Sequence, residues 1–239
     1  MQPQPQRPAP SAPAPDIGSS DRAEQVEFFR EQGFLKLDRL IDADEVARLR
    51  PIYDDIVRAH MGFTPAEMKD KVRLEERPLL VVYPSNDEIA RLREGNVYEA
   101  ATELVAQLVG LPPAQVIGGW RLFFKPPDYG PSKWHQDAAY RPPPHETVSV
   151  WLPIDDATPQ NSCMTYLGGT HHTRKIWPHE FEDDHLIATD FDPTGAVQCP
   201  IPAGGATVHH SCTLHCSGPN QTQRPRRTLG IVCRMTKSS

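Results

Sequence analysis

The stretches GATVHHSCTLHC, residues 205–216, and RRTLGIVCRM, residues 226–235, decide the fold class. In each of them the side chains sort into two faces by alternation, and a segment rich in Pro, Gly, Asn and Gln separates the two. Earlier segments after residue 115 have the same short length and the same kind of boundaries: GGWRLFFK, TVSVWLPI, SCMTYLGG and GAVQCPI. Short segments divided by turn residues are typical of a β-sandwich or barrel.

The preceding half of the chain favours helices. Apolar residues at helical spacing follow Asp21, Asp42 and Asn96, each of which is placed as an N-cap. Gly33 and Gly110 are placed to end the first and third of these helices, and a proline inside the second is expected to limit or kink it. Helices followed by strands predict an α+β fold in which helices brace a sheet.

Composition limits the classes of protein to consider. Residues 1–19 are rich in Pro, Gln and Ala and predict a disordered tail, which leaves residues 20–239 as a single domain. A net charge of −6 argues against a nucleic-acid partner. No apolar run approaches the roughly 20 residues that span a bilayer. Five cysteines without a CxxC pair or an export signal predict reduced thiols and a cytoplasmic location.

The segment WHQDA, residues 134–138, carries a histidine and an acid two positions apart. If this segment is a strand, His135 and Asp137 project from one face and Gln136 projects from the other. One imidazole nitrogen and one carboxylate oxygen can then bind the same ion. Two histidines and one carboxylate on one face of the metal are the ligand set of non-heme Fe(II) oxygenases, so a second histidine is expected from elsewhere in the chain.

The second histidine is expected from residues 207–220, TVHHSCTLHCSGPN. Read as one strand, this segment has a polar face that ends at His215 and Ser217, beside the turn SGPN. Functional groups are often presented where strands meet loops, which favours His215. His209 lies on the same face and, with His210, is the main competitor.

The last strand predicts an anion site. Arg226 shares a face with Thr228, Gly230 and Val232, whose small side chains leave room for a ligand. A buried guanidinium needs a partner, and a small dicarboxylate supplies one through a bidentate contact. Arg227 lies on the opposite face and is expected at the surface or in an ion pair.

Together these motifs resemble the phytanoyl-CoA dioxygenase family of Fe(II)- and 2-oxoglutarate-dependent oxygenases. HQD, residues 135–137, is followed by LHCSGPNQTQRPRR, residues 214–227, in which Arg226 lies eleven positions after His215 as in the family pattern. KPPDYG, NSCMTYLGGTHH and FFREQGFLKLDRLIDADEVARLR also look like family segments. The resemblance therefore covers nearly all of the chain after the tail.

The resemblance implies a double-stranded β-helix, a jelly-roll or cupin-like core braced by the N-terminal helices. It implies that Fe(II) is held by His135, Asp137 and His215, and that Arg226 binds the distal carboxylate of 2-oxoglutarate. It further implies that the cosubstrate pocket is lined by Gln136, Trp151 and Ser217. No role is transferred to Arg121 or Lys125. The implied reaction uses O2 to oxidise a C–H bond and releases succinate and CO2, and the carboxylate of Asp137 favours hydroxylation over halogenation.

The substrate is expected to be a small organic molecule, with a secondary metabolite or an amino-acid-like compound favoured. Lys69, Lys71 and Arg73 are the residues from which a site for a CoA phosphate could be built. Two alternatives stay open: a cupin-type metal enzyme that does not use 2-oxoglutarate, and a non-catalytic jelly-roll binding module. The sequence does not indicate an oligomeric state.

Overall fold

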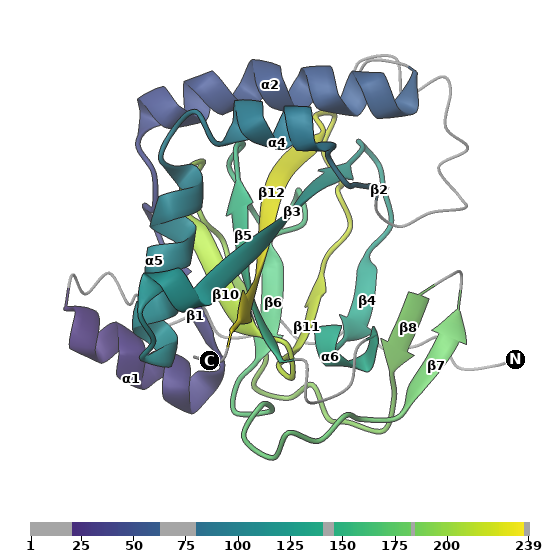
Figure 1. Cartoon of the computed structure of the whole chain (residues 1–239). Helices are drawn as coiled ribbons and strands as arrows, with labels where there is room; N and C mark the ends of the chain where they lie inside the picture. Colours follow the sequence, from purple (N-terminus) through teal and green to yellow (C-terminus); the bar gives the residue numbers. More distant parts are fainter. Residues whose placement is uncertain (1–20, 63–79, 141–145, 183–184, 237–239) are drawn as a thin grey trace, which may run out of the picture.

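The computed structural model describes residues 21–62, 80–140, 146–182 and 185–236. Two antiparallel sheets face each other, with helices along one side (Figure 1). The six-stranded sheet has the order β1 (Phe34–Leu37), β10 (Ala206–His210), β5 (Thr147–Pro153), β12 (Arg226–Met235), β3 (Val116–Lys125), β2 (Leu80–Val82). The four-stranded sheet has the order β4 (Ser132–His135), β11 (Leu214–Ser217), β6 (Met164–Leu167), β9 (Val197–Cys199). The α+β prediction is confirmed.

The remaining elements surround this sandwich. Its helices are α1 (Arg22–Gln32), α2 (Ala43–Met61), α4 (Asn86–Leu92), α5 (Val97–Val109), the 3-10 helix η2 (Pro113–Gln115) and the short α6 (Asp137–Tyr140). A separate hairpin is formed by β7 (His179–Glu182) and β8 (His185–Ala188), and it lies beside β4 (Figure 1). Among the described residues, no helix is both long and apolar enough to cross a bilayer. All five cysteines are free thiols, as predicted.

Alternation along the strands divides the molecule into two cores. Val150 and Leu152 of β5 join the apolar core that the helices form with the outer face of the six-stranded sheet. Trp151 lies between them in sequence and packs instead against Tyr166 and its neighbours, between the two sheets. The space between the sheets also receives polar side chains, which is where the predicted site lies.

The predicted helix ends are largely confirmed. Asp21 and Asp42 accept hydrogen bonds from first-turn N–H groups, and Gly33 and Gly110 adopt the left-handed conformation after α1 and α5. The α2 helix continues through its proline. Asn96 is the N-cap residue of α5, as predicted, but its side chain makes no capping hydrogen bond.

An acid from another helix supplies the hydrogen bond that the Asn96 side chain does not make. The Glu45 carboxylate, which α2 supplies, accepts from the N–H of Val97 at the start of α5. Helix α4 was not predicted, although Ser85 and Glu88 form a capping box there that the sequence displays.

The single strand expected across residues 207–217 is also wrong. Strand β10 ends at His210, the chain turns, and β11 begins at Leu214 in the opposite sheet. Gly33, at the end of α1, helps to fix this turn, since its carbonyl accepts from His210 N at 2.9 Å and from Thr213 Oγ1 at 2.8 Å. Because the sheets face each other, His209 and His215 still project into the same interior.

Candidate metal centre and cosubstrate pocket

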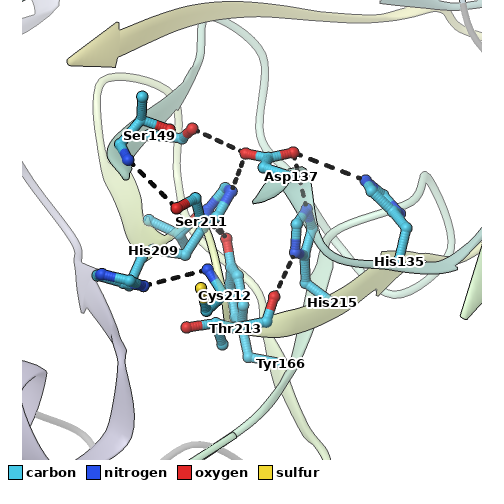
Figure 2. Close-up of polar contacts among 12 residues, drawn as sticks. His135, Asp137, Ser149, Tyr166, His209, Ser211, Cys212, Thr213 and His215 are labelled. Carbon is cyan, nitrogen blue, oxygen red and sulfur yellow. Dashed lines mark hydrogen bonds and ion pairs between the residues drawn. The ribbon is translucent and has the colours of Figure 1, made fainter. Parts of the chain in front are cut away.

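His135, Asp137 and His215 meet at one point between the sheets, where Figure 2 shows their side chains pointing toward one another. One ligand atom from each lies within 4.8 Å of the others. Among the described residues, a group of three or more His, Cys, Asp or Glu side chains placed to hold one metal ion is found here. His215 is almost fully buried, whereas His135 and Asp137 are partly exposed, so the group is accessible from one side.

The backbone positions these three residues through strand pairing and one short helix. His135 and His215 are register partners on β4 and β11, which places their rings 4.2 Å apart. The strand expected through Asp137 is wrong, because β4 ends at His135 and Asp137 begins α6. The helical turn brings the carboxylate of Asp137 back toward both imidazole rings. His135 and Asp137 therefore lie together because of this turn and not because of strand alternation.

Both imidazoles are oriented for metal binding. His135 Nδ1 lies 2.8 Å from the carbonyl of Lys133, and His215 Nδ1 lies 2.9 Å from the carbonyl of Thr213. A carbonyl only accepts, so each Nδ1 carries a proton, and in the neutral ring this leaves the lone pair on Nε2. The Nε2 atoms lie 4.0 and 3.8 Å from Asp137 Oδ1. Hydrogen bonding of the second ring nitrogen is the usual way that ligating histidines are held.

The electrostatics of the group keep Asp137 and His215 in their metal-binding forms. Burial alone would raise the pKa of Asp137, but a hydrogen bond from His209 and the nearby His215 and His135 hold that pKa well below its usual range. Burial, followed by the proximity of His135, holds the pKa of His215 well below its usual range. A carboxylate and neutral imidazoles are the protonation states that a metal ion requires.

Gln136, predicted to line the cosubstrate pocket, is fully buried and bonds to the backbone instead. Its amide nitrogen donates to the carbonyls of Cys212 and Lys175 at 2.7 and 2.9 Å, and its oxygen accepts from Trp177 N at 2.9 Å. Both amide N–H groups are therefore occupied. These contacts tie the loop after β4 to the turn before β11, which positions the two halves of the metal centre.

A second polar group contains the predicted Arg226 together with Lys125. They are register partners on β12 and β3, with exposed fractions of 1% and 0%. Lys125 Nζ donates to Ser162 Oγ, Ser217 Oγ and the Gly218 carbonyl, at 2.9, 3.3 and 2.7 Å. The predicted Ser217 thus touches Lys125.

Arg226 is held on two sides. Its guanidinium lies over the ring of Trp151, 4.8 Å from the centroid, and donates to the Ser162 carbonyl at 2.7 Å. Its Nε is buried without a hydrogen-bond partner among the described residues, as is Thr228 Oγ1 two positions along the same face. Unsatisfied buried polar atoms are rare and call for an explanation.

The charge of this second group is not neutralised by an ion pair within the described residues. Burial, together with the charge of Arg226, lowers the pKa of Lys125 to about 6. Burial likewise lowers the pKa of Arg226 to about 10. The Arg226 Nε–H, without a partner among the described residues, and the neighbouring Lys125 fit a small carboxylate ligand, which would also favour the charged form of Lys125.

The metal group and the Lys125–Arg226 pair are served by the same strands, β5 and β11, so they lie in the same space between the two sheets. Ser149, which bonds Asp137, and Trp151, which contacts Arg226, are two apart on β5. His215 and Ser217 are likewise two apart on β11.

Sequence reasoning gave no role to Lys125 and Ser149, and it weighed His209 only as a ligand. The signal for Lys125 was present, since the charge ends an apolar run, LFFK, on a strand adjacent to that of Arg226. Arg121 instead stacks on the exposed ring of Tyr83, at 5.6 Å.

Other predicted residues lie apart from the metal group. Arg227 pairs with Asp54 and Asp155, which confirms the predicted ion pair. His171 contacts the carbonyl of Arg30. The tail of residues 1–19, the basic residues Lys69, Lys71 and Arg73, and His145 lie outside the described residues.

Comparison with known proteins gives a family for this geometry. The family model for phytanoyl-CoA dioxygenase (PhyH) matches residues 29–228. A relative named "Probable alpha-ketoglutarate-dependent hypophosphite dioxygenase", from Stutzerimonas stutzeri, is 26% identical over 87% of this chain and 77% of that protein. The peroxisomal phytanoyl-CoA dioxygenase of Mus musculus is 25% identical, and this chain spans 66% of its length. These names specify small-molecule substrates.

Solved structures share the fold. The crystal structure of EvdO2 from Micromonospora carbonacea var. aurantiaca, complexed with 2-oxoglutarate, is 30% identical with a TM-score of 0.79 and covers 93% of this chain and 94% of that one. The epimerase SnoN, solved with Fe3+ and alpha-ketoglutarate, is 20% identical with a TM-score of 0.69 over 90% of this chain and 83% of that one, a likeness of fold alone. By its matched length and its fold, the chain belongs to the phytanoyl-CoA dioxygenase (PhyH) family of Fe(II)- and 2-oxoglutarate-dependent oxygenases.

Proposed function

We propose that this protein is a dioxygenase in which His135, Asp137 and His215 bind Fe(II), and in which Lys125 and Arg226 bind the distal carboxylate of 2-oxoglutarate. The reaction hydroxylates a C–H bond of a small organic molecule. One oxygen atom of O2 enters the product and the other enters succinate, while the C1 carboxylate of 2-oxoglutarate leaves as CO2.

The proposal rests above all on the buried cationic pair beside a two-histidine, one-carboxylate group. Lys125 and Arg226 lie on adjacent strands with no ion pair among the described residues, and Arg226 Nε has no partner. A carboxylate placed between them would accept from both, while Trp151 covers one face of the guanidinium. Ser217 supports this pocket by its contact with Lys125, and Gln136 acts as a positioning residue.

His135, Asp137 and His215 would hold the ion from one side, which would leave its other positions for the cosubstrate and O2. Bound Fe(II) supplies the activation of O2, with 2-oxoglutarate as the source of two electrons. The chain supplies a carboxylate and two neutral imidazoles held by backbone carbonyls, together with a pocket that fixes the far end of the cosubstrate.

This pocket distinguishes the proposal from its two alternatives. A cupin-type enzyme that does not use 2-oxoglutarate has no need for two buried cations near its metal. A binding module has no need for metal ligands with oriented lone pairs.

The substrate is proposed to be a small organic molecule, with a secondary metabolite or amino-acid-like compound favoured. Named relatives support small substrates, since they include a phytanoyl-CoA dioxygenase and a methylphosphonate hydroxylase. Residues 20–239 are proposed to be one domain after a disordered tail. A cytoplasmic location is also proposed, supported by the five free cysteines.

The test is an anaerobic titration with Fe(II) and then 2-oxoglutarate, monitored by the weak visible charge-transfer band of the bound pair. The band is expected in the wild type and in Arg227→Ala, and it should be lost in Arg226→Ala at the same 2-oxoglutarate concentration. Absence of the band in iron-loaded wild-type protein would refute 2-oxoglutarate binding at this centre.

A further inference from the structure

We infer that His209 is a positioning residue of the metal centre, which holds one oxygen of Asp137 so that the other is presented to the ion. This inference rests on the proposed function, because it concerns the same Fe(II) site. His209 is not one of the three proposed ligands.

The carboxylate of Asp137 divides its contacts between its two oxygens, as Figure 2 shows. Oδ1 faces His135 and His215, at 4.0 and 3.8 Å from their Nε2 atoms. Oδ2 faces the other way and lies 3.3 Å from His209 Nε2 and 3.0 Å from Ser149 Oγ. One oxygen is thus turned to the metal position and the other is held by protein donors.

The direction of each hydrogen bond follows from what the groups can do. A carboxylate can only accept, so His209 Nε2 carries the proton. In the neutral imidazole Nδ1 then accepts, and the hydroxyl of Tyr166, 3.2 Å away, is its donor. Thr207 Oγ1 lies 2.7 Å from the same hydroxyl. Asp137 therefore fixes the tautomer of His209, and the hydroxyl of Tyr166 satisfies the Nδ1 acceptor that this tautomer presents.

Strand pairing builds this arrangement. His209 and Ser149 are register partners on β10 and β5, so both point at the same oxygen from the six-stranded sheet. Tyr166 comes from β6 in the opposite sheet. His209, Tyr166 and Thr207 are 3%, 0% and 0% exposed, so water does not compete for the hydrogen bonds among these three side chains.

The expected consequence is single-oxygen coordination by Asp137. With Oδ2 held by two donors, rotation that brings both oxygens to the ion costs these two hydrogen bonds. The positions needed by the cosubstrate and O2 then stay open. Loss of such a supporting hydrogen bond lowers metal affinity by about 10- to 100-fold in other metal sites.

The test compares His209→Leu, which removes the donor, with His209→Gln, whose amide N–H can replace Nε2–H. His172→Leu is the matched control, because His172 is exposed and outside the metal group. The anaerobic dissociation constant of Co(II), with its visible ligand-field spectrum, is measured for each variant, as is the Fe(II)–2-oxoglutarate band. Circular dichroism confirms the fold.

We expect His209→Leu to weaken Co(II) binding by about 10- to 100-fold and to shift both spectra. His209→Gln should recover most of the affinity, and His172→Leu should match the wild type. Wild-type affinity and spectra in His209→Leu would overturn the inference. So would a His209→Gln variant as weak as His209→Leu, since packing and not the hydrogen bond would then explain the loss.

Two further outcomes separate the remaining cases. If His209→Leu does not fold, Tyr166→Phe decides, since loss of the hydroxyl should weaken Co(II) binding by several-fold and an unchanged constant would overturn the inference. If His209→Leu loses Co(II) completely while His135→Leu keeps it, His209 is a ligand and the inference is wrong. Absence of the band in wild type would instead refute the proposed function.

Discussion

Lys125 and Arg226 lie opposite each other on adjacent strands, both buried and without an ion pair in the described part of the chain. Holding both residues charged is costly in the free protein, because each charge is removed from water and each repels the other, and this cost is what lowers the pKa of Lys125. A ligand that brings two negative oxygens offsets this cost. The pair is therefore the strongest single indication that the cosubstrate is a dicarboxylate.

Arg226→Ala is expected to raise the dissociation constant for 2-oxoglutarate strongly while the protein keeps its fold. Truncating one partner of a buried, hydrogen-bonded charge contact costs about 2–5 kcal/mol, which is a loss of roughly 30- to 3,000-fold in affinity. Anaerobic titration calorimetry measures this loss. Arg227→Ala is the matched control, since its neighbouring guanidinium binds Asp54 and Asp155 instead. Equal affinities in the two variants would contradict the assignment.

Asp137→Ala is expected to abolish succinate formation, because two imidazoles alone hold Fe(II) weakly. Metal content after dialysis should fall well below one ion per chain, while the fold is kept. Asp38→Ala is the control, since this exposed acid lies elsewhere, in a pair with Lys36. Turnover at the wild-type rate in Asp137→Ala would exclude this residue as a ligand.

The sequence could predict that His135, Asp137 and His215 meet, although the local structure expected around them was partly wrong. His135 and Asp137 were expected on one strand, yet Asp137 starts a helix. His209 and His215 were expected on one strand, yet a turn separates them. In both cases the facing sheets bring the side chains together again, so the ligand set did not depend on the local conformation.

Other features could not be predicted because they depend on contacts between distant segments. The cap of α5 comes from Glu45, 52 residues earlier than Val97, and no local pattern indicates it. The hydrogen bonds of Gln136 reach Cys212 and Lys175, which only the folded chain places nearby. The role of Lys125 likewise depends on strand register.

Arg227→Ala is expected to destabilise the protein while leaving cosubstrate affinity unchanged. Its guanidinium donates to Asp155 at 2.7 and 2.9 Å and to Asp54 at 2.9 and 3.1 Å. The variant leaves two partly buried carboxylates unpaired, at a cost of about 1.5–3 kcal/mol for the charged hydrogen bonds. Urea unfolding monitored by circular dichroism measures the change. A midpoint equal to that of the wild type would contradict this role.

Binding of 2-oxoglutarate is expected to weaken as pH rises above about 6, through Lys125. Burial, with the charge of Arg226, lowers the pKa of this amine from 10.5 to about 6, whereas Cys216 acts weakly in the opposite direction. Its other close contacts, Ser162 and Ser217, are neutral hydroxyls. The amine of the free protein is therefore mostly neutral at pH 7.5.

The sign follows from the charge of the ligand. A bound carboxylate favours the ammonium form and raises the Lys125 pKa, so binding takes up a proton between the free and bound pKa values. Below pH 6 the amine is already charged and the dissociation constant should be flat. Above pH 6 the constant should rise by up to about tenfold per pH unit until the bound pKa is reached. Calorimetry in two buffers with different ionisation enthalpies measures the proton uptake directly. Lys125→Met should bind more weakly and without proton uptake, and equal uptake in this variant would assign the proton to another group.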